Sequence, residues 1–201
     1  MIDLKGSTGR AMSNIQPLNR EQKIVLLQVA RQAIFNSIHR GRELQPETDD
    51  SRLEEKQGVF ITLTTRGTDR GCVGTFDGDG PLINTLVDLS IRAASEESGF
   101  PRLAVQDLPH TDIELSVVSP LKGAYPEQVE LGVHGLFIVR GRSRGVLLPQ
   151  VATQMEWDRE QFLRQTCVKA GLPEDAYQDD DCFVYVFTAE VFSESQIRAG
   201  E

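Results

Sequence analysis

The sequence has few cysteines, few aromatic residues and no long apolar run. Its 201 residues include three cysteines, one tryptophan and three tyrosines. Cys72, Cys167 and Cys182 show no C-x-x-C spacing and are odd in number, which argues against a disulfide framework or a zinc knuckle. No segment approaches the roughly 20 apolar residues of a membrane helix, and no apolar block follows a basic start. We therefore expect a soluble, reduced, cytoplasmic protein.

Positive charge is also scarce, because 21 basic residues face 30 acidic ones and the formal net charge is −9. This balance argues against nucleic acid as a partner. Several carboxylates gather between residues 174 and 181, whereas Arg140, Arg142 and Arg144 fall in one predicted hairpin loop. These arginines, or Arg70, are compatible with a small anionic ligand, and a solvated turn is the alternative interpretation of the loop.

The sequence lacks the standard short motifs of enzymes. It contains neither G-x-G-x-x-G between a strand and a helix nor G-x-x-x-x-G-K-[ST], and neither H-E-x-x-H nor G-x-S-x-G. From the residues alone we predict no metal site and no cofactor.

Periodicity divides the chain into helices and hairpins. Residues 1–17 are predicted to be a mobile arm, and a helix follows from an Asn19 cap, with Gln22 completing a capping box, to Gly41. Residues 42–57 are predicted to be a surface loop. Alternating residues 59–64 and 71–76 predict a hairpin, and two adjacent apolar rows after Pro81 predict a buried helix.

The second half of the chain continues this mixture. Strands are predicted at residues 113–117, 136–139, 146–148 and 183–188. A further helix, capped by Asp158 with Gln161, ends at Gly171, and Trp157 is predicted to pack on Phe162. Because hairpins mix with helices without regular alternation, the sequence predicts an α+β fold.

The segment Arg70-Gly71-Cys72-Val73-Gly74-Thr75 is the most unusual part of the sequence. Gly71 and Gly74 predict a bulge, or a place where a ligand or another backbone comes close. Cys72 between them would be less shielded than most cysteines, and Arg70, at the same strand parity, would favour its thiolate. The alternative is a buried structural cysteine beside a glycine bulge. Cys167 and Cys182 are predicted to lie in the core.

Three other side chains suggest chemistry. His134 directly precedes a strand and would serve there either as an acid or base near neutral pH or as a turn residue. Glu114 and Ser116 lie on the strand face opposite Ile113 and Leu115. Such alternation usually means solvated positions, and ligand-facing side chains are the minority interpretation.

Several motifs, in order, resemble the AMMECR-type domain family, called protein A of the AmmeMemoRadiSam system in bacteria and archaea. Residues 58–63 and 70–76 resemble the family's L-R-G-C-I-G signature, and residues 113–120 resemble its E-[VL]-S-V-L-S-P strand. Residues 132–136, 145–152 and 157–172 resemble later motifs. The resemblance covers residues 18–194. We expect a single domain at residues 18–195, with a short tail at residues 196–201.

The chain departs from the family pattern at three points. Asp69 stands where the signature has leucine, and the usual D-P-R-F-P stretch is Glu97-Ser98-Gly99-Phe100-Pro101, so an expected arginine is missing. Tyr177 replaces a frequent tryptophan. Any role of that arginine in the family does not transfer to this chain.

The resemblance implies antiparallel sheets with packed helices, arranged as a larger and a smaller lobe around a cleft near the signature strand. It also implies an A component of a three-part system, whose partners would be a MEMO-type protein and a radical SAM protein. We expect a substrate or partner to bind at Arg70, Gly71, Gly74, Thr75, Glu114 and Ser116. Cys72 would be a nucleophile or covalent carrier, with His134 as its base. A non-catalytic interaction or regulatory module is the alternative.

Overall fold

The computed structural model describes residues 16–39 and 44–200. Most of the predicted arm, and the predicted helix end at Gly41, lie outside the described residues. Helix α1 (Arg20–His39) begins at the predicted cap. The Gln22 backbone N–H donates to Asn19 Oδ1 at 2.9 Å, and the Asn19 N–H donates to Gln22 Oε1 at 2.9 Å. The predicted capping box is therefore confirmed.

The first lobe is built on a four-stranded antiparallel sheet. Its strands are β1 (Gly58–Thr65), β2 (Thr68–Thr75), β3 (Thr111–Val118) and β8 (Ala189–Ser193), in the order β2-β1-β3-β8. The β1–β2 turn has positive φ at Arg66 and Gly67, as a two-residue type I′ hairpin turn requires. The predicted hairpin is confirmed, and the tight turn lets β2 begin at Thr68.

Helices cover one face of this sheet. Val59, Ile61 and Leu63 of β1 alternate onto that face and are buried with α1 and α2 (Leu82–Ala93). The α2 helix starts one residue after Pro81, which occupies the N-cap position. The opposite face, which carries the even-numbered residues of β1, points toward the second lobe.

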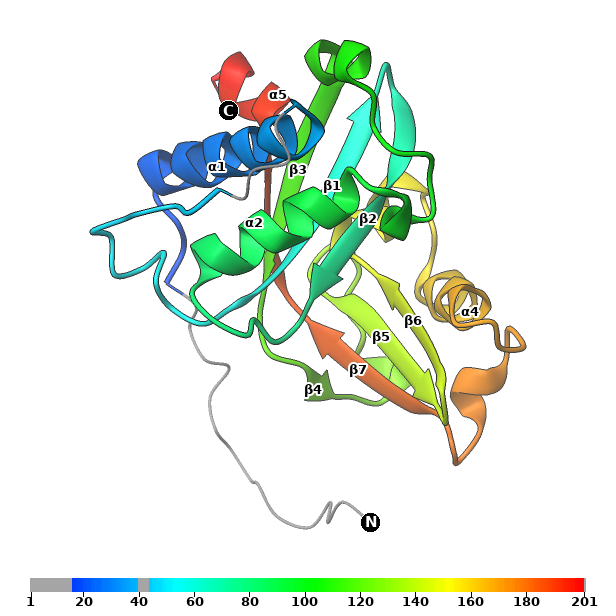
Figure 1. Ribbon diagram of the computed structural model, residues 1–201. Helices are drawn as coiled ribbons and strands as arrows, with labels where there is room; N and C mark the ends of the chain where they lie inside the picture. The colour runs from blue at the N-terminus through cyan, green and yellow to red at the C-terminus, as the bar shows by residue number, and fades with distance from the viewer. Residues whose placement is uncertain (1–15, 40–43, 201) are drawn as a thin grey trace.

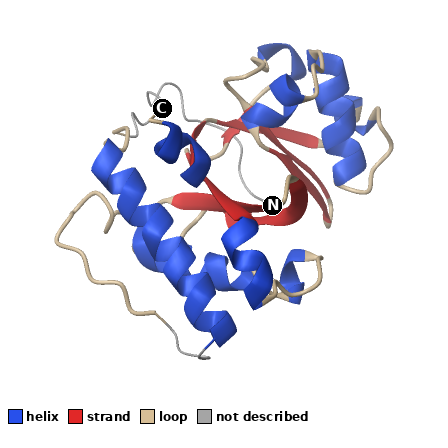
Figure 2. Cartoon of the chain, turned by 90° about the horizontal axis from the view of Figure 1, so that it is seen from above, coloured by secondary structure: helices blue, strands red, loops and turns tan. Residues whose placement is uncertain are grey.

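The second lobe is a smaller four-stranded antiparallel sheet with its own core. Its strands are β4 (Lys122–Gly123), β5 (Gly135–Arg140), β6 (Ser143–Leu147) and β7 (Phe183–Phe187), in the order β4-β7-β5-β6. Helices α3 (Pro149–Gln154) and α4 (Arg159–Lys169) pack on it. Figure 2 shows the strands between two groups of helices, one for each lobe.

The predicted cap and core of α4 are confirmed. The Gln161 N–H donates to Asp158 Oδ1 at 2.8 Å, and the Asp158 N–H donates to Gln161 Oε1 at 3.0 Å. Trp157 packs in the same apolar cluster as buried Phe162. Cys167 is buried in this cluster, as predicted, whereas Cys182 is only partly buried and packs against it.

The C-terminal segment differs from the sequence prediction. Residues 189–193 form β8 and Glu194–Ala199 form helix α5. Ser193 and Gln196 make a reciprocal capping box at its start, and Ile197 packs against the first core. The expected tail from residue 196 is therefore a packed helix. The remaining short elements are 3-10 turns: η1 (Glu96–Ser98), η2 (Val105–His110), η3 (Pro126–Gln128) and η4 (Ala176–Gln178).

The second lobe is an insertion between β3 and β8, so the chain passes between the lobes at Ser119 and again at Thr188. These two residues are tied together: the Ser119 N–H donates to the Thr188 carbonyl at 2.9 Å, and the Thr188 N–H donates to Ser119 Oγ at 2.9 Å. Beside them, the rings of Phe60, Phe76 and Phe187 pack across the lobe boundary. The α+β class with two antiparallel sheets is confirmed.

Within residues 16–39 and 44–200, no helix combines the length and apolar character needed to cross a membrane.

Candidate functional site

The glycine-flanked segment of β2 contains the predicted bulge. Thr62 pairs with Cys72, but Thr64 pairs with Asp69, so β2 has one extra residue there. Gly71 has φ +100°, and a Cβ on it would lie 2.8 Å from the Phe100 ring. The Gly71 N–H donates to Asp69 Oδ1 at 2.8 Å. Asp69, where this chain departs from the family signature, therefore stabilises the bulge that directly precedes Cys72.

Cys72 belongs to a polar row that crosses the sheet. The β-ladder pairs Cys72 with Thr62, and Thr62 with Glu114, on three adjacent strands. Directly paired residues of neighbouring strands place their side chains on the same face, about 5 Å apart. Val73, the neighbour of Cys72, packs on the opposite face against the first core. The row therefore lies on the face that points toward the second lobe.

The second lobe supplies a partner for this row. Gln150 of α3 donates through Nε2 to Glu114 Oε1 at 2.9 Å, and Nε2 lies 3.4 Å from Ser116 Oγ. Ser116 is buried and Glu114 is half-buried. The usual interpretation of these two positions, solvated side chains, is therefore wrong. The alternation was read correctly, but the second lobe covers that face of the strand.

Burial affects both titratable groups of the row. Desolvation raises the pKa of Glu114, and the hydrogen bond from Gln150 opposes the rise. Cys72 is exposed, yet the surrounding protein desolvates its sulfur, and this raises the pKa of the thiol above its ordinary 9.0. The Thr62 hydroxyl and then the Lys169 charge at the end of α4 lower that pKa, whereas the carboxylates of Asp69 and Glu114 raise it.

Arg70 does not act on Cys72 as predicted. Its Nη2 donates to the Pro101 carbonyl at 2.7 Å, and the pKa of the Cys72 thiol is raised rather than lowered. The prediction assumed regular alternation from residue 70 to residue 72. The bulge at Gly71 interrupts that alternation, and the cation that acts on the thiol is Lys169 of the second lobe.

Gly74 and Thr75 have local structural partners. A Cβ on Gly74 would lie 2.2 Å from two carbons of the Phe60 ring, so this glycine provides room for the ring. Thr75 Oγ1 donates to the Asp77 carbonyl at 2.8 Å and accepts from the Asp77 N–H at 3.2 Å, in the turn after β2. Both residues lie within three positions of Cys72 on β2, and their binding role stays a prediction.

His134 is held within its own turn. The ring Nδ1 of His134 accepts a hydrogen bond from the backbone N–H of Glu130 at 3.1 Å. The backbone N–H of His134 donates to the Glu130 carbonyl at 2.9 Å. These contacts match the turn interpretation. No hydrogen bond among the described residues joins His134 to Cys72, so its role as a base stays a prediction.

The hairpin that carries Arg140, Arg142 and Arg144 (the arginine hairpin) lies against the carboxylate-rich residues 174–181 (the acidic loop). Arg140 donates to Asp179 Oδ2 at 2.8 Å and to Asp181 Oδ2 at 3.0 Å. These contacts raise the pKa of the Arg140 guanidinium. Arg142 and Arg144 are more exposed members of the same hairpin. An anionic ligand at this hairpin would compete with the acidic loop for Arg140.

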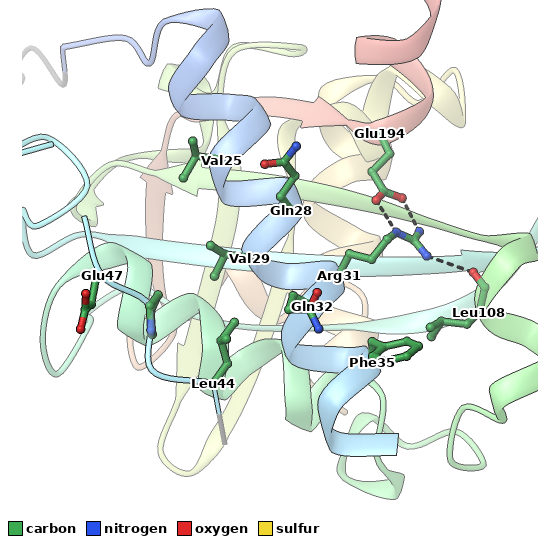
Figure 3. A pocket seen from close by; sticks show the side chains of 11 residues that line it. Val25, Gln28, Val29, Arg31, Gln32, Phe35, Leu44, Glu47, Leu108 and Glu194 are labelled. Atoms are coloured by element: carbon green, nitrogen blue, oxygen red, sulfur yellow. Dashed lines mark hydrogen bonds and ion pairs between the residues drawn. The ribbon is translucent and has the colours of Figure 1, made fainter. Parts of the chain in front are cut away.

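A separate groove lies along α1, on the far side of the first sheet from Cys72. Its volume is about 670 Å³, and Val25, Val29, Phe35, Leu44 and Leu108 line it. Figure 3 shows Arg31 at one end, paired with Glu194 and bonded to the Leu108 carbonyl at 3.0 Å. The groove shares no lining residue with the Cys72 row. The described residues contain no group of three or more His, Cys, Asp or Glu side chains that could hold a metal ion.

Three residues of the Cys72 region were not proposed as site residues from the sequence. Thr62 had a detectable signal, because a threonine inside an apolar strand faces away from its buried neighbours. Gln150 lies within a family-like motif, but nothing in its local pattern indicates Glu114 as its partner. Lys169 ends a helix, where a lysine needs no further explanation.

Comparison with known proteins gives consistent matches along the chain. A family model described as AMMECR1 matches residues 27–192. A protein of Methanothermobacter thermautotrophicus is 39% identical over 186 residues, which cover 89% of this chain and 97% of that protein. A protein of Methanopyrus kandleri is 37% identical, covering 90% of this chain and 92% of its own length.

The fold also matches a solved structure. The crystal structure of an uncharacterised protein from Pyrococcus horikoshii has a TM-score of 0.79 and 36% sequence identity to this chain. The match covers 85% of this chain and 90% of that one.

Proposed function

Because the chain belongs to the AMMECR1 family, we propose that it is the A component of an AmmeMemoRadiSam-type system and binds a substrate or partner beside Cys72. The observation that best supports this proposal is the polar row of Cys72, Thr62 and Glu114 at the boundary between the lobes. The row combines an accessible thiol with a hydroxyl and a carboxyl on one face. It is the place where the family-like signature and chemically useful side chains coincide.

In this proposal Cys72 acts as a nucleophile or a covalent carrier. Because desolvation by the surrounding protein raises the pKa of Cys72, the thiol form predominates near neutral pH, and reaction needs a group that takes its proton. His134 is the base predicted from the sequence. Glu114 shares the row but lies two strands from Cys72, about 10 Å across the sheet, so it acts on the thiol through its charge and not as its base.

The proposed partners are a MEMO-type protein and a radical SAM protein, and the argument for them is the family resemblance. The test is to tag this chain, express it with the corresponding proteins from the same genome, and compare Cys72→Ser with the matched control Cys182→Ser. We expect Cys72→Ser to keep the complex but abolish the output of the pathway, while Cys182→Ser keeps both. Unchanged output in Cys72→Ser would exclude a chemical role for Cys72.

The second candidate is a non-catalytic interaction or regulatory module. The raised pKa of Cys72 favours it, because a protonated thiol is a weak nucleophile. The same experiment separates the two candidates. A module would retain partner capture and pathway output in Cys72→Ser, but would lose both when the surface around Cys72 is blocked by a bulky Thr62→Arg substitution.

A further inference from the structure

Strand β2 forms one edge of the first sheet. In the order β2-β1-β3-β8 it has a strand neighbour on one side only. Its extensive contacts are with β1, with α2 beneath the sheet and with η1. An edge strand of eight residues offers unpaired backbone N–H and C=O groups to another chain unless something covers it.

The two halves of this edge differ. Residues 69–71 are protected, because the bulge distorts the strand and the segment after η1 lies against it. Phe100 packs on Gly71, and Arg70 donates to the Pro101 carbonyl. For residues 72–75, by contrast, no backbone hydrogen bond beyond the pairing with β1 is found among residues 16–39 and 44–200. Along these four residues, of which Cys72 is exposed and the others are half-buried, the outward backbone groups therefore have no hydrogen-bond partner among the described residues.

This length of the edge carries the Cys72 thiol. Cys72 and Gly74 face the lobe boundary, whereas Val73 packs toward the first core. Since Gly74 has no side chain, the Cys72 thiol is the only side chain that residues 72–74 present on that face. Cys72 is also exposed.

We propose that residues 72–75 of β2 bind an extended peptide segment of a partner as an added strand. The inference rests on the proposed function and names its substrate class as a polypeptide. The chemistry favours this occupant, because alternating N–H and C=O groups along an edge are complementary to another extended backbone. An added strand would lie about 4.8 Å from β2, and the residue paired with Cys72 would have its side chain beside the thiol.

The test uses equilibrium disulfide exchange with the full chain in a Cys182→Ser background. The probe is the symmetric disulfide of the blocked peptide Thr-Val-Cys-Val-Thr, which exchanges with the Cys72 thiol and releases one peptide thiol. It is compared with the disulfides of two analogues that are N-methylated at odd or at even positions. In a strand paired along one edge, only alternate amides face the neighbour. We expect one analogue to form the Cys72 disulfide about tenfold less favourably, since each lost hydrogen bond costs roughly 2- to 10-fold, and the other to match the parent peptide.

Two results would overturn the proposal: equal equilibria for all three peptides, or equal losses for both analogues, because neither shows alternate pairing. Oxidised glutathione, which releases one reduced glutathione on exchange, is the small-disulfide control. If glutathione forms the disulfide and no peptide does, strand addition is excluded while the accessible site of the proposed function stands. If glutathione also fails, the thiol is closed, and the proposed function loses its central observation.

Discussion

Gln150 of the second lobe donates a hydrogen bond to Glu114 of the first, with 2.9 Å between Nε2 and Oε1. The same nitrogen lies 3.4 Å from the buried Ser116 hydroxyl. Gln150 is 36 positions from Glu114 and 34 positions from Ser116 in the sequence. The contact joins the lobes at the polar row, whereas the aromatic packing of Phe60 and Phe187 joins them near the chain crossings.

We predict that Gln150→Leu destabilises the protein. The substitution leaves the Glu114 carboxyl and the Ser116 hydroxyl without their partner, and an unsatisfied buried polar group costs about 1–3 kcal/mol. Urea unfolding measures the loss. The control is Gln154→Leu on the exposed part of the same helix. Equal stability of the two variants would mean that the contact contributes nothing to joining the lobes.

We predict that Glu114→Gln is stabilising at neutral pH. The folded-state pKa of Glu114 is raised above its ordinary 4.5, so the folded protein binds this proton more tightly than the unfolded chain. The contribution of the group to stability is complete below about pH 4.5 and is lost as the pH rises through the folded pKa. The gain from Glu114→Gln should therefore grow between about pH 4 and pH 7.

Denaturant unfolding at several pH values checks this prediction. Glu127→Gln, which removes an exposed carboxylate outside the row, is the matched control for the loss of one negative charge. A constant difference between Glu114→Gln and the parent at all pH values would contradict a raised pKa at Glu114.

The pKa of Cys72 should respond to its neighbours in opposite directions. The rate of iodoacetamide alkylation should rise with pH to a midpoint above 9.0. Thr62→Val and Lys169→Met should raise that midpoint, because each removes an interaction that favours the thiolate. Asp69→Asn should lower it, since it removes a negative charge but keeps an oxygen that can accept from the Gly71 N–H. Arg70→Met should leave it unchanged; a rise in that variant would restore the sequence-based role of Arg70.

Gly74→Ala should destabilise the first lobe strongly. The new Cβ would overlap the Phe60 ring, whose carbons lie 2.2 Å away, and forced repacking of a filled core costs about 1–3 kcal/mol. Gly123→Ala is the control, because nothing lies within 4 Å of a Cβ there, and it should change stability by less than about 0.5 kcal/mol. Thermal unfolding monitored by circular dichroism distinguishes the two.

Arg31→Met should release helix α5. Arg31 pairs with Glu194, whose side chain is 11% exposed, and donates to the carbonyls of Leu108 and Thr111. Breaking such a pair leaves a largely buried carboxylate, at a cost of about 3 kcal/mol. Hydrogen exchange should rise first in residues 194–199. Arg164→Met removes the exposed pair with Glu160 and should have little effect.

Local sequence patterns predicted most elements because their causes are local. The reciprocal caps at Asn19 and Asp158 depend on a residue three positions away, and the buried face of β1 follows from strict alternation. The bulge at Gly71 was likewise indicated by two glycines in one short strand. The short elements β4, α3, β8 and α5 have no comparable repeat, so the sequence did not predict them.

The sequence by itself determined the α+β class, the family and the position of Cys72 in an unusual strand. Tertiary structure alone decided what surrounds that thiol. Whether Glu114 and Ser116 face water or protein depends on the placement of Gln150, which arrives from a separate lobe. Desolvation by the surrounding protein sets the upward direction of the shift in the pKa of Cys72, and Thr62 and Lys169 oppose it. Both effects arise from groups close in space and distant in sequence, which no local pattern records.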